Sequence, residues 1–292
     1  MPQESYPVDH LSSAVSVACC QLAPVFGDIS GNMRRSRDIL MRAADMGAQL
    51  AVLPELANTG YAFSNRDEAR GLAQSDAGEC VSEWRELAAQ LDLIVVAGFC
   101  EGDGDGLYNS AVLLTPDGRQ ARYRKAHLWD GEKRIFDLGC QPPPVVETAI
   151  GRLGVMICYD LEIPEWVRLP ALEGADLLCV PVNWPVLPQH REALPIEVIK
   201  AQANAAFNRL PVAVCDRAGH ERGIDWAGCS LITDADGCKL ALASRQEQAG
   251  ADEIVFAQID LRASRDKHIS RHNHVLSDRR PDLYGKLHGT AI

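Results

Sequence analysis

Three residues of types that can do chemistry each follow directly on an apolar or alternating, strand-like run. Cys158 closes the apolar part of GVMICYDLEIPE, Glu55 follows LAVLP, and Lys125 ends the alternating stretch 119–125. A cysteine becomes a nucleophile when a neighbouring base or positive charge favours its thiolate. A carboxylate and an ammonium group supply these two functions. The sequence therefore predicts one site, provided that the fold brings the three strand ends together.

Strand ends are where such residues are expected to meet, because active sites in α/β folds gather at the carboxyl ends of strands. Burial of Glu55 would raise its proton affinity and suit it as a base. Lys125 precedes apolar and aromatic residues, so we expect its ammonium inside the protein, where it would favour a Cys158 thiolate and stabilise a tetrahedral intermediate. Glu132, seven residues after Lys125, is a candidate to hold that lysine or to orient a substrate nitrogen.

Cysteine is frequent in this chain, which contains ten of them, at positions 19, 20, 80, 100, 140, 158, 179, 215, 229 and 238. No C-x-x-C pair occurs and the spacing is irregular, which argues against a zinc knuckle or a redox dithiol. Strand-like surroundings favour reading the other nine as small core hydrophobes. Cys158 is thus predicted to be the one functional thiol.

The elements that would position these residues follow from hydrophobic periodicity and turn signals. Strands are predicted at 15–22, 50–53, 93–99 and 153–157. Helices are predicted at 33–46, ended by Gly47, and after an N-cap at Ser82. A hairpin is predicted from 108–115 and 119–125, and a further helix should open at Pro164.

The same order of elements occurs twice. The pattern GAxLxxxP appears as GAQLAVLP at 47–54 and as GADLLCVP at 174–181, and NSAVLLTPDG at 109–118 is echoed by AGCSLITDADG at 227–237. Shared α/β composition is the alternative explanation, but order and turn residues agree as well. Two strand–helix–strand–hairpin units packed sheet to sheet would form a sandwich with helices outside both sheets.

Bulk composition sets the class of protein. With 292 residues, 47% hydrophobic and 24% charged, the chain can build a full core. We expect a disordered leader at 1–13, a single domain at 14–287 and a C-terminal arm at 270–292. The net charge of −11 disfavours nucleic acid and anionic membranes as partners. Neither a secretory signal nor an apolar run of membrane-spanning length is visible, so a cytoplasmic protein is expected.

Three segments together resemble the nitrilase superfamily of carbon–nitrogen hydrolases: LPELANTGY, YRKAHLW and GVMICYDLEIPE. The likeness runs from about Ala14 to Gly285. It implies an α/β, four-layer α-β-β-α sandwich with an internal pseudo-two-fold repeat and a Glu-Lys-Cys catalytic set that needs no metal or organic cofactor. By this resemblance Glu55 is the general base, Cys158 the nucleophile, Lys125 the group that stabilises the tetrahedral intermediate, and Glu132 a supporting glutamate.

The residues beside the nucleophile bear on the reaction. Nitrilases of this superfamily usually carry Cys-Trp-Glu, whereas Cys158-Tyr159-Asp160 resembles the amidase and carbamoyl-hydrolase branches. The implied reaction is hydrolysis of a small linear amide through a cysteine thioester, with the oxyanion held by Lys125 and the Tyr159 N–H. N-carbamoyl amines, nitriles and acyl transfer to an amine remain alternatives. A non-catalytic ligand-binding or scaffold protein is the alternative outside enzymes.

Glu162 stands where several relatives carry arginine, and it could select an amine-bearing (ω-amino) amide. It could instead pair with an arginine such as Arg168. Substrate contacts are further predicted for Tyr61, Trp129, Tyr159, Asn183 and Trp184, although a core position for Trp184 is equally expected. His127 is read as a structural neighbour of Lys125. The polar tail suits a homodimer or larger homo-oligomer.

Overall fold

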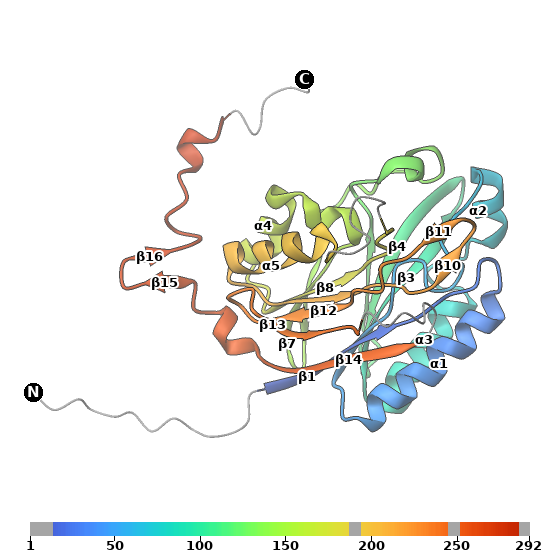
Figure 1. Cartoon of the computed structure of the whole chain (residues 1–292), viewed down its shortest axis with the longest axis horizontal. Helices are drawn as coiled ribbons and strands as arrows, with labels where there is room; N and C mark the ends of the chain where they lie inside the picture. The colour runs from blue at the N-terminus through green and yellow to red at the C-terminus, as the bar shows by residue number, and fades with distance from the viewer. Residues whose placement is uncertain (1–13, 187–193, 245–251, 286–292) are drawn as a thin grey trace, which may run out of the picture.

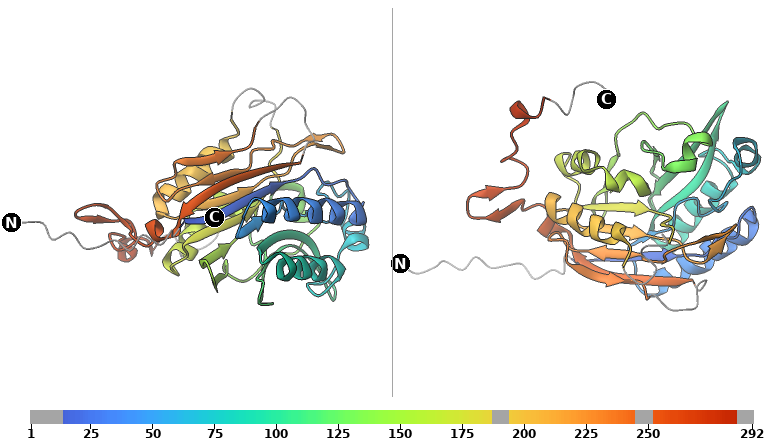
Figure 2. Two further views of the ribbon diagram at one scale, coloured as in Figure 1. Left: turned by 90° about the horizontal axis from the view of Figure 1, so that it is seen from below. Right: turned by 45° about the horizontal axis from the view of Figure 1, so that its top comes forward.

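Two six-stranded sheets pack against each other, and helices cover their outer faces (Figures 1 and 2). The structure is a computed structural model that describes residues 14–186, 194–244 and 252–285. The predicted leader 1–13 and the end of the predicted arm, 286–292, lie outside these residues. Helices α1 and α3 lie along one sheet, and α4 and α5 lie along the other (Figure 1).

The first sheet has the strand order β14-β1-β2-β3-β4-β5. Its strands are β1 (Ala14–Gln21), β2 (Leu50–Val52), β3 (Ile94–Asp103), β4 (Gly106–Leu114), β5 (Gln120–Arg124) and β14 (Glu253–Asp260). The second sheet has the order β13-β12-β9-β8-β7-β6. Its strands are β6 (Val145–Thr148), β7 (Gly151–Val155), β8 (Leu177–Pro181), β9 (Val212–Cys215), β12 (Leu231–Thr233) and β13 (Lys239–Leu242).

The two sheets repeat one topology. Strands β1, β2 and β3 are parallel and continue into the antiparallel pair β4 and β5; β7, β8 and β9 are likewise parallel and continue into the antiparallel β12 and β13. The GAxLxxxP segments lead into the equivalent strands β2 and β8, and the two echoed hairpin segments supply β4 and β12. The predicted four-layer sandwich with an internal pseudo-two-fold repeat is confirmed.

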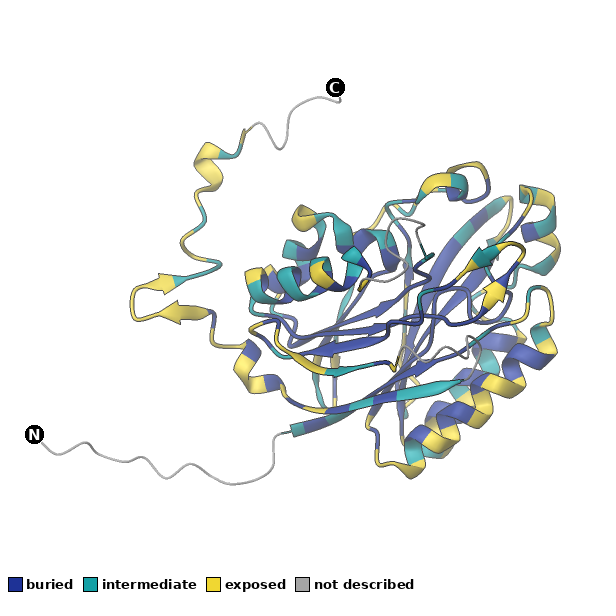
Figure 3. Cartoon of the chain, in the orientation of Figure 1, coloured by how far each residue is buried: buried dark blue, intermediate teal, exposed yellow. Residues whose placement is uncertain are grey.

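Buried strands explain the apolar runs of the sequence. In β1, Val17 and Cys19 face the second sheet, while Ala18 and Cys20 face the helical layer. A strand covered on both faces reads as a nearly continuous apolar run rather than an alternating one. Figure 3 shows the result, with dark, buried strands in the middle and exposed outer faces on the helices.

The helices are α1 (Ile29–Asp45), α2 (Arg66–Leu72), α3 (Glu79–Leu91), α4 (Pro164–Leu172) and α5 (Ile196–Asn208). Two predicted helix starts were wrong. Helix α1 begins four residues before position 33, because the Asp28 side chain accepts the Gly31 N–H and caps it there. Helix α3 begins after Gly78, so Ser82 lies inside its first turns, where its hydroxyl donates to the Ala77 carbonyl.

Short elements complete the described chain: β10 (His220–Glu221), β11 (Ile224–Asp225), β15 (His268–Ser270), β16 (Asn273–His274), and the 3-10 helices η1 (Asp130–Arg134), η2 (Cys158–Glu162), η4 (Leu261–Ser264) and η5 (Pro281–Leu283). Strands β15 and β16 and helix η5 extend away from the sandwich (Figure 1). None of the helices within the described ranges is long and apolar enough to cross a membrane.

The cysteines do not all behave as predicted. Cys140 and Cys238 are exposed, so these two are not core hydrophobes. Both lie in irregular stretches between strands, outside the sheets that bury other thiols. The remaining cysteines are buried, and among them Cys158 follows the end of β7.

Candidate active site

The predicted strand ends meet at one buried cluster. Glu55 follows β2, Lys125 follows β5, and Cys158 follows β7 of the other sheet. Lys125 Nζ donates to Glu55 Oε1 at 2.7 Å and to Glu132 Oε1 at 2.8 Å. The side chains of Lys125, Glu55 and Glu132 are only 0%, 0% and 3% exposed. Glu132 therefore holds the lysine, as one of its two predicted roles required.

Glu55 has one occupied and one free oxygen. Its Oε1 accepts from Lys125 and, at 2.7 Å, from Asn109 Nδ2. Its Oε2 is buried and has no hydrogen-bond partner among the described residues. Burial raises the pKa of Glu55 to about 7, against the opposing charge of Lys125. Near neutral pH, Glu55 can thus both accept and return a proton.

Lys125 is charged despite its burial. Burial by itself would lower the pKa of Lys125, but the charges of Glu132 and Glu55 outweigh it and hold that pKa well above its usual value. The site therefore favours the charged ammonium form of Lys125.

Cys158 sits at a constrained corner. Strand β7 ends at Val155, two residues before the predicted end at 157, and Cys158 opens the 3-10 helix η2 with a φ of +47°. A non-glycine residue rarely adopts this left-handed conformation, which the surrounding structure must maintain. The side chain is buried, and Sγ lies 3.9 Å from the Asn183 carbonyl oxygen.

The surroundings of Cys158 shift its pKa in opposite directions. Burial raises the pKa of the Cys158 thiol well above its usual value, Glu55 raises it further, and Lys125 offsets only part of this rise. These contributions together favour the neutral thiol over the thiolate, while Lys125 by itself acts toward the thiolate, the direction that the sequence predicted. Such a thiol depends on a neighbouring base for its nucleophilicity.

Asp160 joins the segments that carry Lys125 and Cys158, and the sequence reasoning had used it only as a branch marker. Its Oδ1 accepts the His127 N–H at 2.9 Å and contacts His127 Nδ1 at 2.7 Å. Its Oδ2 accepts the Tyr123 hydroxyl at 2.7 Å and the Ile157 N–H at 3.2 Å. The available signal was a carboxylate only two residues after a candidate nucleophile.

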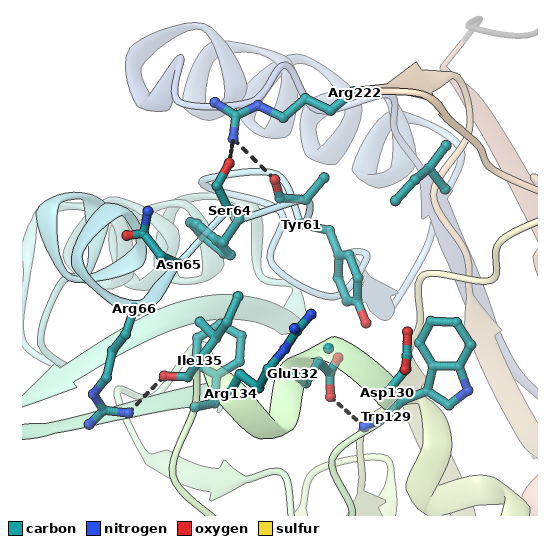
Figure 4. Close-up of a pocket in the computed structure, with 15 residues that line it drawn as sticks. Tyr61, Ser64, Asn65, Arg66, Trp129, Asp130, Glu132, Arg134, Ile135 and Arg222 are labelled. Atoms are coloured by element: carbon teal, nitrogen blue, oxygen red, sulfur yellow. Dashed lines mark hydrogen bonds between the residues drawn. The ribbon is translucent and has the colours of Figure 1, made fainter.

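A pocket of about 520 Å³ lies beside the cluster (Figure 4). Predicted substrate-contact residues Tyr61 and Trp129 line it together with Glu132. The Tyr61 side chain points toward Glu132 in Figure 4; burial raises the pKa of the Tyr61 hydroxyl above its usual value, and the nearby charge of Glu132 raises it further. The other lining residues are Ala62, Phe63, Ser64, Asn65, Arg66, Asp130, Gly131, Arg134, Ile135, Phe136, Arg222 and Ile224.

The other predicted contacts are placed differently. Asn183 lies at the cluster, since its Nδ2 donates to the Glu55 carbonyl at 3.0 Å and its buried Oδ1 has no partner among the described residues. Trp184 is buried in the core, which was the alternative prediction to a substrate contact. Tyr159 and Glu162 follow Cys158 in η2 but are not among the residues that line the 520 Å³ pocket.

Glu162 forms an ion pair with Lys200 of α5, a contact that brings together two helical segments. It does not pair with Arg168, which instead lies 3.5 Å from the Val275 carbonyl. Within residues 14–186, 194–244 and 252–285, no three histidine, cysteine, aspartate or glutamate side chains are grouped as a metal site would require.

The family of the chain follows from comparison with known proteins. The carbon–nitrogen hydrolase family matches residues 16–267, nearly the whole sandwich. The chain therefore belongs to the carbon–nitrogen hydrolase family, within the nitrilase superfamily, and it is an enzyme of that class.

Individual relatives cover the chain almost end to end. A nitrilase of Pyrococcus abyssi is 37% identical over 271 residues, which are 92% of this chain and 99% of the relative. An (R)-stereoselective amidase of a Pseudomonas species is 32% identical and spans 93% and 94% of the two chains. The solved carbon–nitrogen hydrolase of Helicobacter pylori G27 superposes with a TM-score of 0.82 at 28% identity and covers 94% of this chain and 98% of its own.

Proposed function

We propose that the protein hydrolyses the C–N bond of a small linear amide through a thioester on Cys158 and releases ammonia or an amine. The observation that carries this proposal is the buried Glu55: one of its oxygens anchors Lys125, the other has no hydrogen-bond partner among the described residues, and both Glu55 and Lys125 interact electrostatically with Cys158. That arrangement suits a base that activates a cysteine and a cation that receives the oxyanion.

In the first half-reaction, Glu55 Oε2 takes the thiol proton and Sγ of Cys158 attacks the amide carbon. The negative charge that develops on the carbonyl oxygen meets the Lys125 ammonium and the Tyr159 N–H, which lies in the first turn of η2 and lacks an intrahelical partner. Glu55 then gives its proton to the leaving nitrogen, the C–N bond breaks, and the acyl group remains on sulfur as a thioester.

In the second half-reaction, Glu55 removes a proton from water, and the hydroxyl attacks the thioester carbon. The C–S bond breaks, the sulfur leaves with the proton held by Glu55, and the carboxylic acid departs. The same carboxyl group is acid and base in turn, which a pKa near neutrality favours.

The finer substrate assignment is an amine-bearing amide selected by Glu162. Its ion pair with Lys200 lowers the charge it can offer, so a cationic substrate would have to compete with that lysine. N-carbamoyl amines and nitriles are the alternative substrates. If Glu162 selects cations, Glu162→Gln will lower kcat/KM for an ω-amino amide and spare the uncharged amide of equal length; equal effects on both would remove the assignment.

The decisive experiment measures ammonia release from a panel of linear amides, N-carbamoyl amines and nitriles, with Cys158→Ala as the matched inactive variant. Release from amides that disappears in Cys158→Ala is expected. Release from nitriles alone would move the protein to nitrile hydrolysis. Release that survives in Cys158→Ala would contradict the thioester mechanism.

The cellular setting remains a proposal as well. We place the enzyme in the cytoplasm, because all ten cysteines are free, as a reducing compartment requires. Detection of the protein in a membrane or secreted fraction would contradict this placement.

A further inference from the structure

Behind the pocket wall, Glu221 of β10 reaches from the second half of the chain to the loop that follows Glu55. Its Oε1 accepts two consecutive backbone N–H groups, those of Tyr61 at 2.8 Å and Ala62 at 2.6 Å. The side chain is buried. One carboxylate oxygen therefore fixes the backbone from which the Tyr61 ring enters the pocket.

Gly60 makes this close approach possible. Its φ is +80°, and a Cβ at this position would lie 2.5 Å from Glu221 Oε2 and 3.0 Å from the Phe26 Cα. A larger residue would have to displace the carboxylate or the backbone. The loop is thus shaped to receive Glu221.

Arg217 holds the other oxygen of Glu221. Its Nη1 donates to Glu221 Oε2 at 2.8 Å, and its Nη2 donates to the Pro24 carbonyl at 2.9 Å. The guanidinium lies 4.7 Å from the centre of the Trp226 ring, and that ring packs edge-on against Tyr61 at 5.2 Å. The ion pair consequently supports both the backbone and the ring of Tyr61.

From Tyr61 the contacts continue into the catalytic cluster. The Tyr61 side chain points toward Glu132 in the pocket that both residues line (Figure 4), and Glu132 Oε1 accepts from Lys125 at 2.8 Å. We propose that Glu221, oriented by Arg217, is a positioning residue of this enzyme: it sets Tyr61 so that Glu132 and Lys125 keep the geometry needed at Cys158. This inference rests on the roles proposed above for Lys125 and Glu132.

The buried Glu221–Arg217 ion pair contributes to position more than to stability. Removing two charges from water costs nearly as much as their attraction returns, so such pairs add little net stability. Their directional hydrogen bonds nevertheless fix geometry. Here the geometry is that of a tyrosine in the active-site pocket.

The test is a double-mutant cycle between Glu221→Gln and Tyr61→Phe. The readout is the second-order rate of Cys158 alkylation by iodoacetamide, which requires no knowledge of the substrate. All variants carry Cys140→Ser and Cys238→Ser, which remove the two exposed thiols. The kcat and KM for the best amide are measured in parallel.

We expect each single variant to lower the alkylation rate and kcat about tenfold, with KM within twofold, because a displaced Tyr61 leaves Glu132 and Lys125 misplaced. The double variant should lose less than twofold beyond either single variant. Losses that multiply would mean that Glu221 does not act through Tyr61. A Glu221→Gln rate within twofold of the parent would also overturn the proposal.

Glu68→Gln is the matched control. Glu68 pairs with Arg222, so it links the same two segments through another ion pair, and it does not touch the Tyr61 N–H. Its alkylation rate and kcat should equal those of the parent. A loss as large as that of Glu221→Gln would show that any ion pair between these two segments supports the loop, without a specific role for Glu221. If Glu221→Gln fails to fold by circular dichroism, the pair Arg217→Met with Glu221→Leu, which leaves no unpaired charge, takes its place in the cycle.

The outcomes also separate this inference from the proposed reaction. If the parent hydrolyses no amide but the Glu221→Gln and Tyr61→Phe variants lose alkylation rate non-additively, the positioning role is supported and the amidase reaction is refuted. If the parent hydrolyses amides and Glu221→Gln does so at the same rate, the amidase reaction is supported and the positioning role of Glu221 is refuted.

Discussion

Glu55 illustrates how much one residue's environment decides. A carboxylate in water would be ionised throughout the neutral range, but burial raises the pKa of Glu55 to about 7 and Lys125 keeps it from rising further. One oxygen is committed to Lys125 and Asn109, which leaves the other for the proton of Cys158. In the proposed mechanism, one oxygen of this carboxyl group holds Lys125 and the other exchanges protons.

This environment predicts the pH dependence of the reaction. Below pH 7 Glu55 is protonated and cannot accept the thiol proton, so kcat/KM should fall about tenfold per unit as the pH drops, and level off above 7. Measurement of kcat/KM between pH 5 and 9 checks this. Glu55→Gln should lose about 10²- to 10⁴-fold and lose the inflection; an inflection that persists in this variant would assign it to another group.

At the scale of elements, Asp160 binds two active-site segments into one unit. Its carboxylate, at the start of η2, receives the backbone and ring of His127 after β5 and the Ile157 N–H after β7. Strand β5 belongs to the first sheet and β7 to the second. The buried side chain of Asp160 therefore connects the segment that carries Lys125 to the segment that carries Cys158.

Asp160→Asn should weaken this connection. The amide offers an N–H₂ group where donors already point, so we expect the free energy of unfolding to fall by about 1–3 kcal/mol. We also expect kcat to fall at least tenfold, because a small misplacement of catalytic groups is costly. Chemical denaturation and steady-state kinetics measure the two effects.

The control for this variant is Glu83→Gln, which changes a surface carboxylate of α3 that pairs with Arg37 of α1. Exposed pairs contribute about 0–1 kcal/mol, so this variant should resemble the parent in stability and kcat. An Asp160→Asn protein with parental kcat would show that Asp160 supports the fold alone.

At the scale of the whole molecule, the segment from β15 to η5 extends away from the sandwich (Figure 1). Ile269 and Leu283 on this segment are 63% and 67% exposed. It also lies beyond the family match, which ends at residue 267. Exposed apolar side chains on an extended arm are typical of a contact with a second subunit, which agrees with the homo-oligomer predicted from the polar tail.

We therefore expect a homodimer or larger assembly in which the arm takes part. Ile269→Asp combined with Leu283→Asp should reduce the mass measured by light scattering after size exclusion. Met46→Asp, at an exposed apolar side chain beside the end of α1, should leave the mass unchanged. A monomeric parent protein would contradict the prediction.

Local sequence patterns predicted much of the fold and the residue types of the site. Strand-like runs that end at Glu55, Lys125 and Cys158 predicted strands and the chemical types at their ends. The repeated GAxLxxxP segments predicted the layers. These features are readable because strand periodicity and turn residues act over a few neighbouring positions. Helix starts were less readable, since Asp28 and Gly78 set them through side-chain and backbone contacts at the caps.

The tertiary structure decided the rest. The shifted pKa of Cys158 depends on residues brought close by the fold. Glu162 and Lys200 are 38 positions apart in the sequence, and Glu221 and Tyr61 are 160 positions apart. Composition and spacing by themselves predicted a sandwich with a cysteine, a glutamate and a lysine available for catalysis. Only packing sets their distances and burial, and electrostatic interactions in a buried site depend on those two quantities.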